Sequence, residues 1–226
     1  MPYTARYIDL GLQEYKQAWE FQEKLHHEIV VEKAAGNNTP GKLIFCQHPH
    51  VFTLGRSGQQ NNLLINDEFL KKINASYYKS DRGGDITYHG PGQLVGYPIF
   101  DLEALQIGVK EYIHRIEEAI VLTLSDYRIN ASRLDGATGV WLDTNTPSAR
   151  KICAIGVKVS KSVTMHGFAL NVNTDLKYFS YINPCGFIDK GVTSIQKELG
   201  TEMPFVEVAE NLREKIARSF GIQLFV

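Results

Sequence analysis

The chain has no strong excess of charge of either sign and few cysteines. Its 226 residues include 24 Lys and Arg against 25 Asp and Glu, a formal net charge of −1. Because a general nucleic-acid-binding domain usually carries a basic excess, this balance argues against a nucleic-acid partner. The three cysteines, an odd number, argue against a disulfide framework and are typical of a reducing compartment.

Long hydrophobic runs are also absent. No stretch approaches the roughly 18 apolar residues that a membrane-spanning helix needs. Residues 1–6 show no apolar run behind a basic start, so the sequence predicts no secretory signal. We therefore expect a cytoplasmic protein with no membrane partner.

The remaining composition is that of a folded globular chain. Apolar residues make up 43% of it, enough to bury a sizeable core. No internal repeat or low-complexity linker divides the chain, and its length suits a single domain over residues 1–226.

Hydrophobic periodicity predicts helices mixed with short strands. Helices are expected at 15–36, 67–73, 109–127 and from about 204 to 220. Strands are expected at 42–47, 51–54, near 77, and at 94–100, 139–142, 152–159, 163–165, 168–172 and 222–226. Because strand pairs are joined by short turns, the pattern favours an α/β or α+β fold with one mixed sheet flanked by helices over strict βαβ alternation.

A glycine-rich segment at 82–93 stands out from this pattern. Glycines permit positive φ and let backbone N–H groups approach a ligand closely. A phosphate-binding loop would carry Gly-Lys-Ser/Thr before a helix, whereas Gly83-Gly84 lacks that lysine and the segment leads into a strand. A carbonyl or acyl ligand fits better than a triphosphate, and a tight structural turn is the alternative.

The three cysteines differ in their surroundings. Cys46 and Cys153 lie in apolar, strand-like runs, where cysteine is usually a small buried hydrophobic residue. Cys185 lies in the turn sequence Asn183-Pro184-Cys185-Gly186, which presents its sulfur on a loop, although a lone loop cysteine is more often inert than catalytic. The spacing of the three does not suggest a zinc site.

A nucleophilic cysteine needs a nearby cation, because its unperturbed pKa of about 8.5 leaves little thiolate at neutral pH. Lys151 opens an otherwise apolar strand and is one candidate, although a lysine there is ordinarily a solvated end residue. The histidine candidates are His48, His50, His89 and His166. His48-Pro49-His50 can also be interpreted as metal ligands, but the proline and the lack of a partner cluster favour a loop. The residue pattern alone therefore gives a cysteine candidate and a ligand loop, not a reaction.

Four motifs in order resemble the lipoyl(octanoyl) transferase family, the octanoyltransferases of lipoate assembly. They are Arg82-Gly83-Gly84-Asp85-Ile86-Thr87-Tyr88-His89-Gly90-Pro91-Gly92-Gln93, Lys151-Ile152-Cys153-Ala154-Ile155-Gly156, His166-Gly167-Phe168-Ala169-Leu170-Asn171-Val172 and Asn183-Pro184-Cys185-Gly186. With the segment that begins at His48 they span well over half of the chain. One departure is that the family commonly has Glu-His-Pro-Pro where this chain has Gln47-His48-Pro49-His50.

The resemblance implies a fold like the catalytic domain of biotin and lipoate ligases. It also implies that an octanoyl group passes from acyl carrier protein, through a cysteine thioester, to a lysine of the lipoyl domains of 2-oxoacid dehydrogenases and of the glycine cleavage H protein. Carried over by position, Cys185 is the nucleophile and Lys151 lowers its pKa. The implied acyl-pocket residues are Arg82, Gly83, Gly84, Asp85, Ile86, Thr87, Tyr88, His89, Ala154, Ile155, Gly156, Gly167, Phe168 and Ala169.

No cofactor or metal is implied, because thioester exchange is nearly neutral in energy and aminolysis is downhill. His89 and His166 are candidates for hydrogen-bond support or for fixing loop geometry. Since acyl carrier proteins and lipoyl domains are typically acidic, we expect a local basic surface drawn from Arg56, Arg82, Lys158 and Lys161. The rival interpretations are an ATP-dependent lipoate or biotin ligase on the same fold, a cysteine thioester hydrolase, and a catalytically silent binding module.

Overall fold

A large mixed sheet forms the centre of the molecule in the computed structural model, which describes residues 3–183 and 191–226. Its strand order in this part of the chain is β12-β1-β2-β6-β10-β9-β8-β7, with β11 beside β9. The strands are β1 (Thr4–Leu12), β2 (Gly41–Gln47), β6 (Gln93–Ile99), β7 (Ala131–Leu134), β8 (Ala137–Leu142), β9 (Arg150–Ser160), β10 (Val163–Asn171), β11 (Gly191–Val192) and β12 (Gln223–Phe225). β1 pairs in parallel with β2 and β12, and β11 with β9, whereas the pairs from β2 through β7 are antiparallel. The predicted mixed sheet is confirmed.

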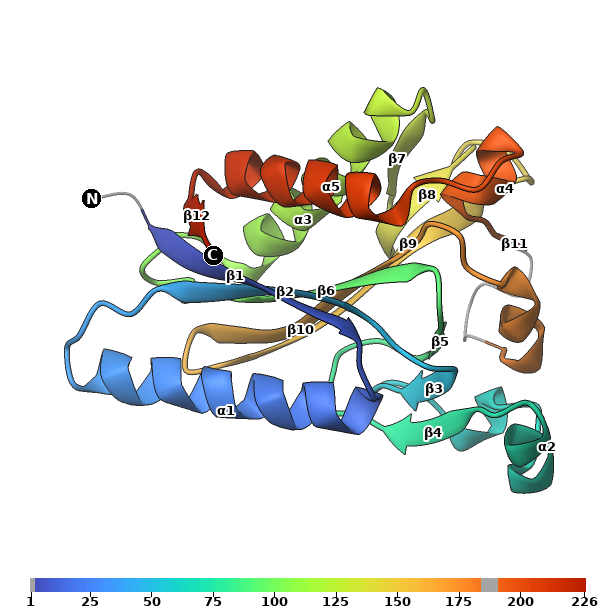
Figure 1. Ribbon diagram of the computed structural model, residues 1–226, viewed down its shortest axis with the longest axis horizontal. Helices are drawn as coiled ribbons and strands as arrows, with labels where there is room; N and C mark the ends of the chain where they lie inside the picture. Colours follow the sequence, from blue (N-terminus) through green and yellow to red (C-terminus); the bar gives the residue numbers. More distant parts are fainter. Residues whose placement is uncertain (1–2, 184–190) are drawn as a thin grey trace.

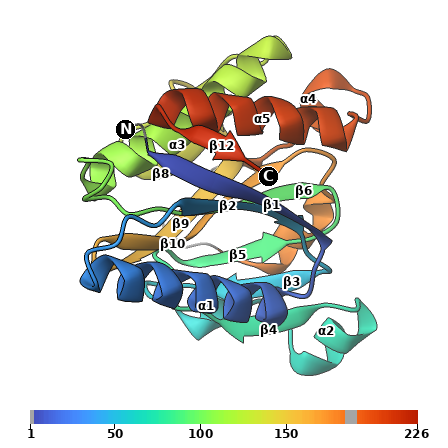
Figure 2. The ribbon, with the colours of Figure 1, turned by 60° about the vertical axis from the view of Figure 1, so that its left-hand side comes forward.

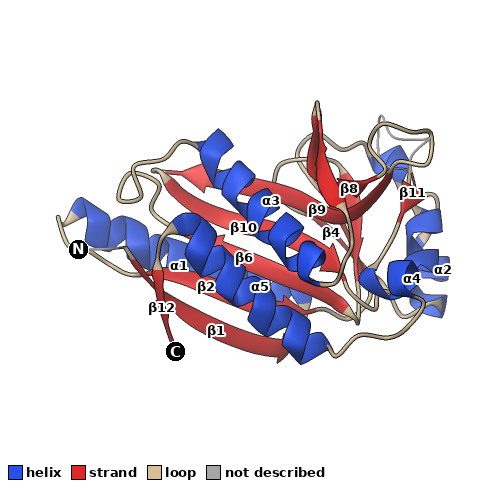
Figure 3. Ribbon diagram, turned by 90° about the horizontal axis from the view of Figure 1, so that it is seen from above, coloured by secondary structure: helices blue, strands red, loops and turns tan. Residues whose placement is uncertain are grey.

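Helices cover both faces of the large sheet (Figures 1 and 2). The long helix α1 (Tyr15–Ala34) packs on β6 and β10 through Ala18, Leu25 and Ile29. On the opposite face α3 (Val109–Asp126) and α5 (Phe205–Phe220) lie side by side, as Figure 3 shows from above. Their apolar stripes close the larger core, and the short helix α4 (Ile195–Leu199) contributes Ile195 to it. No helix among the described residues is long and apolar enough to cross a bilayer.

A second, small sheet sits beside the large one. It has the order β4-β3-β5, formed by β3 (Val51–Leu54), β4 (Ser76–Lys79) and β5 (Ile86–His89). The helix α2 (Asp67–Lys72) and the 3-10 turns η1 (Gln60–Asn62) and η2 (Leu176–Tyr181) accompany it. Asn66 caps α2, since its side chain accepts a hydrogen bond from the Phe69 N–H at 2.9 Å.

Several expectations about the elements need correction. β1, β5, β7 and β11 were not predicted as strands, although β5 falls inside the glycine-rich segment, and α4 was not predicted as a helix. The two short strands expected at 163–165 and 168–172 are one continuous strand, β10. It remains continuous because it pairs with β9 from Val163 to Leu170, Gly167 opposite Gly156.

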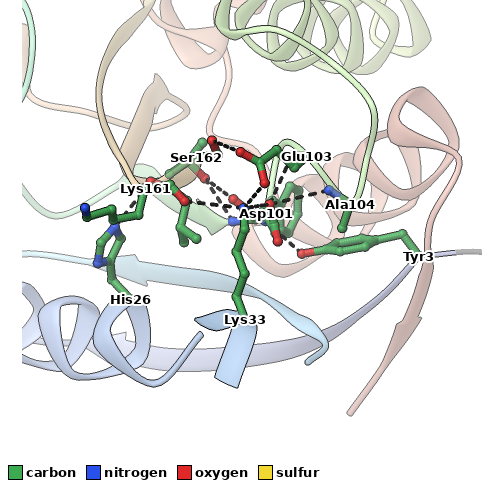
Figure 4. A network of polar contacts seen from close by, with 11 residues as sticks. Tyr3, His26, Lys33, Asp101, Glu103, Ala104, Lys161 and Ser162 are labelled. Atoms are coloured by element: carbon green, nitrogen blue, oxygen red, sulfur yellow. Dashed lines mark hydrogen bonds and ion pairs between the residues drawn. The ribbon is translucent and has the colours of Figure 1, made fainter. Parts of the chain in front are cut away.

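A network of charged and polar groups joins the far end of α1 to the large sheet (Figure 4). The Lys33 ammonium donates to Asp101 Oδ1 at 2.8 Å and lies 2.8 Å from Glu103 Oε2. Ser162 Oγ donates to Glu103 Oε1 at 2.7 Å, and the Asp101 N–H donates to the Tyr3 hydroxyl at 2.9 Å. The network therefore fixes the end of α1 against the segment after β6 and the turn between β9 and β10.

Candidate active site

An apolar cavity of about 570 Å³ lies between the large sheet and the small sheet with η2. Twelve of the fourteen predicted pocket residues line it: Arg82, Gly84, Asp85, Ile86, Thr87, His89, Ala154, Ile155, Gly156, Gly167, Phe168 and Ala169. Gly83 and Tyr88 lie outside its wall. Gly83 instead donates its N–H to the Val157 carbonyl at 2.9 Å, and Tyr88 stacks on Tyr178 in the core of the small sheet.

Strand register explains how distant segments meet at this cavity. β9 and β10 pair so that Gly156 lies opposite Gly167 and Ala154 opposite Ala169. The glycines are required by close approach: a Cβ on Gly156 would lie 2.7 Å from the Gly83 carbonyl oxygen, and one on Gly167 would lie 2.1 Å from the Gly96 oxygen. The glycine-rich segment therefore packs directly on β9, where a larger side chain would push it away.

Lys151, the second residue of β9, also lines the cavity. Burial lowers the pKa of its amino group. Its Nζ lies 4.6 Å from the centroid of the Trp141 ring. The pairing of β9 with β8 skips Ile152, and such a bulge changes the direction in which neighbouring side chains point. The lysine is thus a cavity residue and not the solvated strand end that its sequence position suggests.

Cys185 lies outside the described residues. The residues on either side of segment 184–190 are described, and Asn183, Gly191 and Val192 all line the same cavity as Lys151. The other two cysteines are buried in β2 and β9, as expected, and burial raises the pKa of both the Cys46 and the Cys153 thiols.

His89 is fully enclosed at the cavity wall. Burial lowers its pKa well below the ordinary histidine value, so the ring is neutral at pH 7. Its Nδ1 lies 2.8 Å from Gln93 Oε1, while Gln93 Nε2 donates to Asn171 Oδ1 at 2.9 Å and Asn171 Nδ2 donates to the Thr193 carbonyl at 2.9 Å. A buried hydrogen-bonded chain therefore runs from β5 through β6 and β10 to the residue after β11.

His166 holds an unusual backbone conformation for a non-glycine residue, with φ at +60°. Its Nε2 lies 2.8 Å from Asp81 Oδ1, and its backbone N–H donates to Gln22 Oε1 at 3.0 Å. Burial lowers the pKa of His166, whereas the hydrogen bond from His166 holds the Asp81 pKa below its usual range. A strained backbone conformation of this kind persists only where surrounding contacts hold it in place, and it is often found at functional sites.

One of the four residues expected to form a basic surface, Arg82, is buried. Arg82 is 8% exposed, and its guanidinium donates to the Thr53 carbonyl at 2.5 Å and to Thr53 Oγ1 at 2.9 Å. It lines the cavity and fixes the glycine-rich segment to β3, so it is not available to a protein partner. Lys158 also differs from a free surface charge, because its ammonium lies 2.5 Å from Asp81 Oδ2.

The His48-Pro49-His50 segment lies at the small sheet. His48 is buried, with Nδ1 2.6 Å from the Gln13 carbonyl and Nε2 2.7 Å from the Tyr97 hydroxyl. His50 stacks on Tyr178 with ring centroids 4.1 Å apart. Among residues 3–183 and 191–226 no three His, Cys, Asp or Glu side chains are grouped as metal ligands.

The sequence did not identify several residues of the wall. Tyr15 is the first residue of α1, where helical spacing indicates a core position, yet it lines the cavity and stacks on His89 with centroids 6.0 Å apart. Trp141 on β8 and Leu176, Phe179 and Ser180 of η2 also line it. Gln93, Asn171 and Asn183 carried a signal, since each belongs to one of the four motifs.

Solved structures with the same arrangement of sheets and helices are lipoate and biotin protein ligases. A bipartite lipoate protein ligase of Thermoplasma acidophilum superposes with a TM-score of 0.72 at 16% identity, covering 99% of this chain and 86% of that one. A biotin protein ligase of Aquifex aeolicus gives a TM-score of 0.52 at 11% identity, covering 97% and 70%. At these identities the likeness establishes the fold, and it confirms the predicted ligase-like architecture.

Sequence comparison then identifies the family. Residues 14–217 match the lipoyl protein ligase A/B catalytic domain, and the chain belongs to that family. A protein of Bacteroides thetaiotaomicron named octanoyltransferase is 56% identical over 211 residues, 93% of each chain. A second octanoyltransferase, from Parabacteroides distasonis, is 55% identical over 217 residues, covering 96% and 98% of the two chains. The family predicted from the four motifs is confirmed.

Proposed function

We propose that this protein transfers an octanoyl group from the thioester of acyl carrier protein to a lysine amine of lipoyl domains, through an acyl-Cys185 intermediate. The observation that carries the proposal is that residues from distant parts of the sequence line one cavity. Lys151, twelve of the fourteen predicted pocket residues and both described ends of segment 184–190 line the same apolar space. The family membership and the octanoyltransferase relatives support the same reaction.

Chain connectivity supports Cys185 as the nucleophile. Cys185 follows Asn183 by two residues in the sequence. Asn183 lines the cavity, and Val192 pairs with Lys151 in the register of β11 and β9. The two buried thiols, Cys46 and Cys153, have raised pKa values and are poor nucleophiles by comparison.

Lys151 serves both halves of the reaction in this proposal. As an ammonium it stabilises the Cys185 thiolate, which attacks the donor thioester, and it then gives its proton to the departing pantetheine sulfur of the carrier and becomes a neutral amine. The acyl-enzyme carries no thiolate charge, and the buried amine of Lys151 then has a lowered pKa. In that state it can accept the proton of the incoming lysine amine as the amide bond forms and the Cys185 sulfur leaves.

The donor supplies the energy for the acyl transfer, so the reaction takes no cofactor and no metal. Exchange of one thioester for another is nearly neutral, and aminolysis to an amide is downhill. The neutral ring of His89 and the chain of hydrogen bonds behind it orient the cavity wall and carry no charge into the apolar space.

The test is to supply two substrate pairs separately. Octanoyl-carrier protein with a lipoyl domain should give octanoylated lipoyl domain without ATP. Octanoate with ATP and the same domain should give none. Product formed only from octanoate and ATP would replace the proposal with a ligase on this fold, and release of free octanoate in the presence of the lipoyl domain would replace it with a hydrolase.

A further inference from the structure

The Lys151 side chain rests against the face of a buried tryptophan. The Nζ of Lys151 lies 4.6 Å from the centroid of the Trp141 ring, within the range of a cation–π contact. Trp141 is 1% exposed, and both residues line the cavity. A desolvated contact of this kind stabilises an ammonium more than the same contact in water does.

The indole is itself held in place. Its Nε1 donates to the Ala137 carbonyl at 2.9 Å, a bond within β8 that fixes the orientation of the ring. Trp141 pairs with Lys151 in the register of β8 and β9. The ring face and the lysine therefore lie on neighbouring strands and approach each other without a flexible loop between them.

Gly139 of β8 lies beside the Lys151 side chain. Its φ is +120°, and a Cβ there would lie 3.5 Å from Lys151 Cε and 2.5 Å from the Cys153 carbonyl oxygen. The buried Glu117 on α3 accepts the Gly139 N–H at 2.9 Å, which anchors this part of β8 from the opposite layer. The path of the Lys151 side chain is thus bounded by a glycine on one side and by the indole on the other.

Four ionisable groups near Lys151 or in its cavity, all among the described residues, are neutral or paired with other side chains. Cys153 on the same strand stays a neutral thiol because burial raises its pKa. Glu117 lies 3.2 Å from Arg133, and Arg150 pairs with Glu198 of α4 at 2.6 Å. His89, in the same cavity, is neutral at pH 7.

We propose that Trp141 is a positioning residue, whose indole face fixes the Lys151 amino group at the cavity wall and stabilises its charged form. This inference deepens the proposed function, on which it rests for the role of Lys151. Burial and the indole act on the protonation of Lys151 in opposite directions. Burial favours the neutral amine, and the ring face favours the ammonium. The opposition keeps the amino group close to the balance between cation and base that the two halves of the reaction require.

The test is a direct titration of Lys151 in the full-length protein. Lysine labelled with ¹³C at Cε is incorporated, and the Lys151 signal is identified by its loss in Lys151→Arg. In Trp141→Leu the titration midpoint should fall by about one pKa unit, a tenfold change in the protonation equilibrium. In Trp141→Phe it should fall by less, because a phenyl ring keeps a weaker π face.

The two variants leave similar space in the sheet, so the difference between them isolates the aromatic face from the loss of volume. Phe45→Leu, another buried aromatic position, should leave the midpoint unchanged. A midpoint in Trp141→Leu equal to or above that in Trp141→Phe overturns the inference. If Trp141→Leu does not fold, wild type and Trp141→Phe must still differ in the same order.

The titration needs no acyl transfer, which separates the two proposals. The predicted order of midpoints in a protein that forms no octanoyl adduct would leave the positioning intact and remove the proposed function. An unchanged midpoint in a protein that forms the adduct would remove the positioning alone.

Discussion

Filling the cavity from Ala154 tests whether the acyl chain lies there. Ala154 lies on β9 opposite Ala169 of β10, and both side chains line the cavity. A leucine at 154 adds three carbons to the wall without changing the backbone. If it displaces two or three methylenes of an octanoyl chain, the loss is about 2 kcal/mol, or roughly 30-fold in the rate of acyl-enzyme formation.

The assay compares octanoyl and butanoyl pantetheine thioesters as donors, with the acyl-enzyme followed by intact mass. Ala154→Leu should slow octanoyl loading by about that factor and leave butanoyl loading nearly unchanged. Ala217→Leu is the matched control, because Ala217 is also half-buried but packs in the core at α5. An equal loss for both chain lengths, or no loss at all, would show that the acyl chain does not pass Ala154.

Four further predictions follow from described contacts. Lys151→Met should slow both acyl-enzyme formation and transfer from it by about 100-fold or more in single-turnover experiments, whereas normal transfer would exclude Lys151 as the base. Asn171→Leu should lower the free energy of unfolding by about 1–3 kcal/mol in urea, because it leaves one of the two Gln93 Nε2 hydrogens without an acceptor, while the other still binds the Tyr88 carbonyl. The loss should be smaller when Gln93→Leu is already present. Burial lowers the pKa of His48 to about 4, so the protein takes up a proton at this ring when it unfolds below pH 6.5. The free energy of unfolding should therefore fall by about 3 kcal/mol between pH 6.5 and pH 4 from this ring alone. A free energy of unfolding that does not change over this range would contradict the buried neutral ring. Lys33→Met should cost about 1–2 kcal/mol in thermal unfolding, since it leaves Asp101 without its cation, and an unchanged midpoint would show that the network is dispensable.

The local sequence pattern predicted the helices that bury one apolar face. The helices at α1, α3 and α5 follow from apolar residues at helical spacing, and Asn66 marks the start of α2. β1 could not be predicted in this way, because it is held between β2 and β12, and β12 comes from the other end of the chain. Such pairing depends on the whole fold and leaves a weak local signal.

The site also contains some residues that the sequence predicted and others that it did not. The motifs located Lys151 and most of the wall, because the close packing of Gly156 and Gly167 requires those residue types at fixed places. Tyr15 and Trp141 reach the cavity only through the packing of α1 and β8, and an aromatic residue in a helix or strand normally indicates core. The burial of Arg82 likewise depends on Thr53, which no sequence pattern links to it.

Mapping the acyl adduct decides whether Cys185 carries the octanoyl group. The protein is mixed with octanoyl-carrier protein without a lipoyl domain, digested, and analysed by peptide mass. We expect a single octanoyl thioester on the peptide that contains Cys185. This adduct should be absent in Cys185→Ser and should form slowly in Lys151→Met. An adduct on Cys46 or Cys153, or efficient octanoylation of a lipoyl domain by Cys185→Ser, would contradict it.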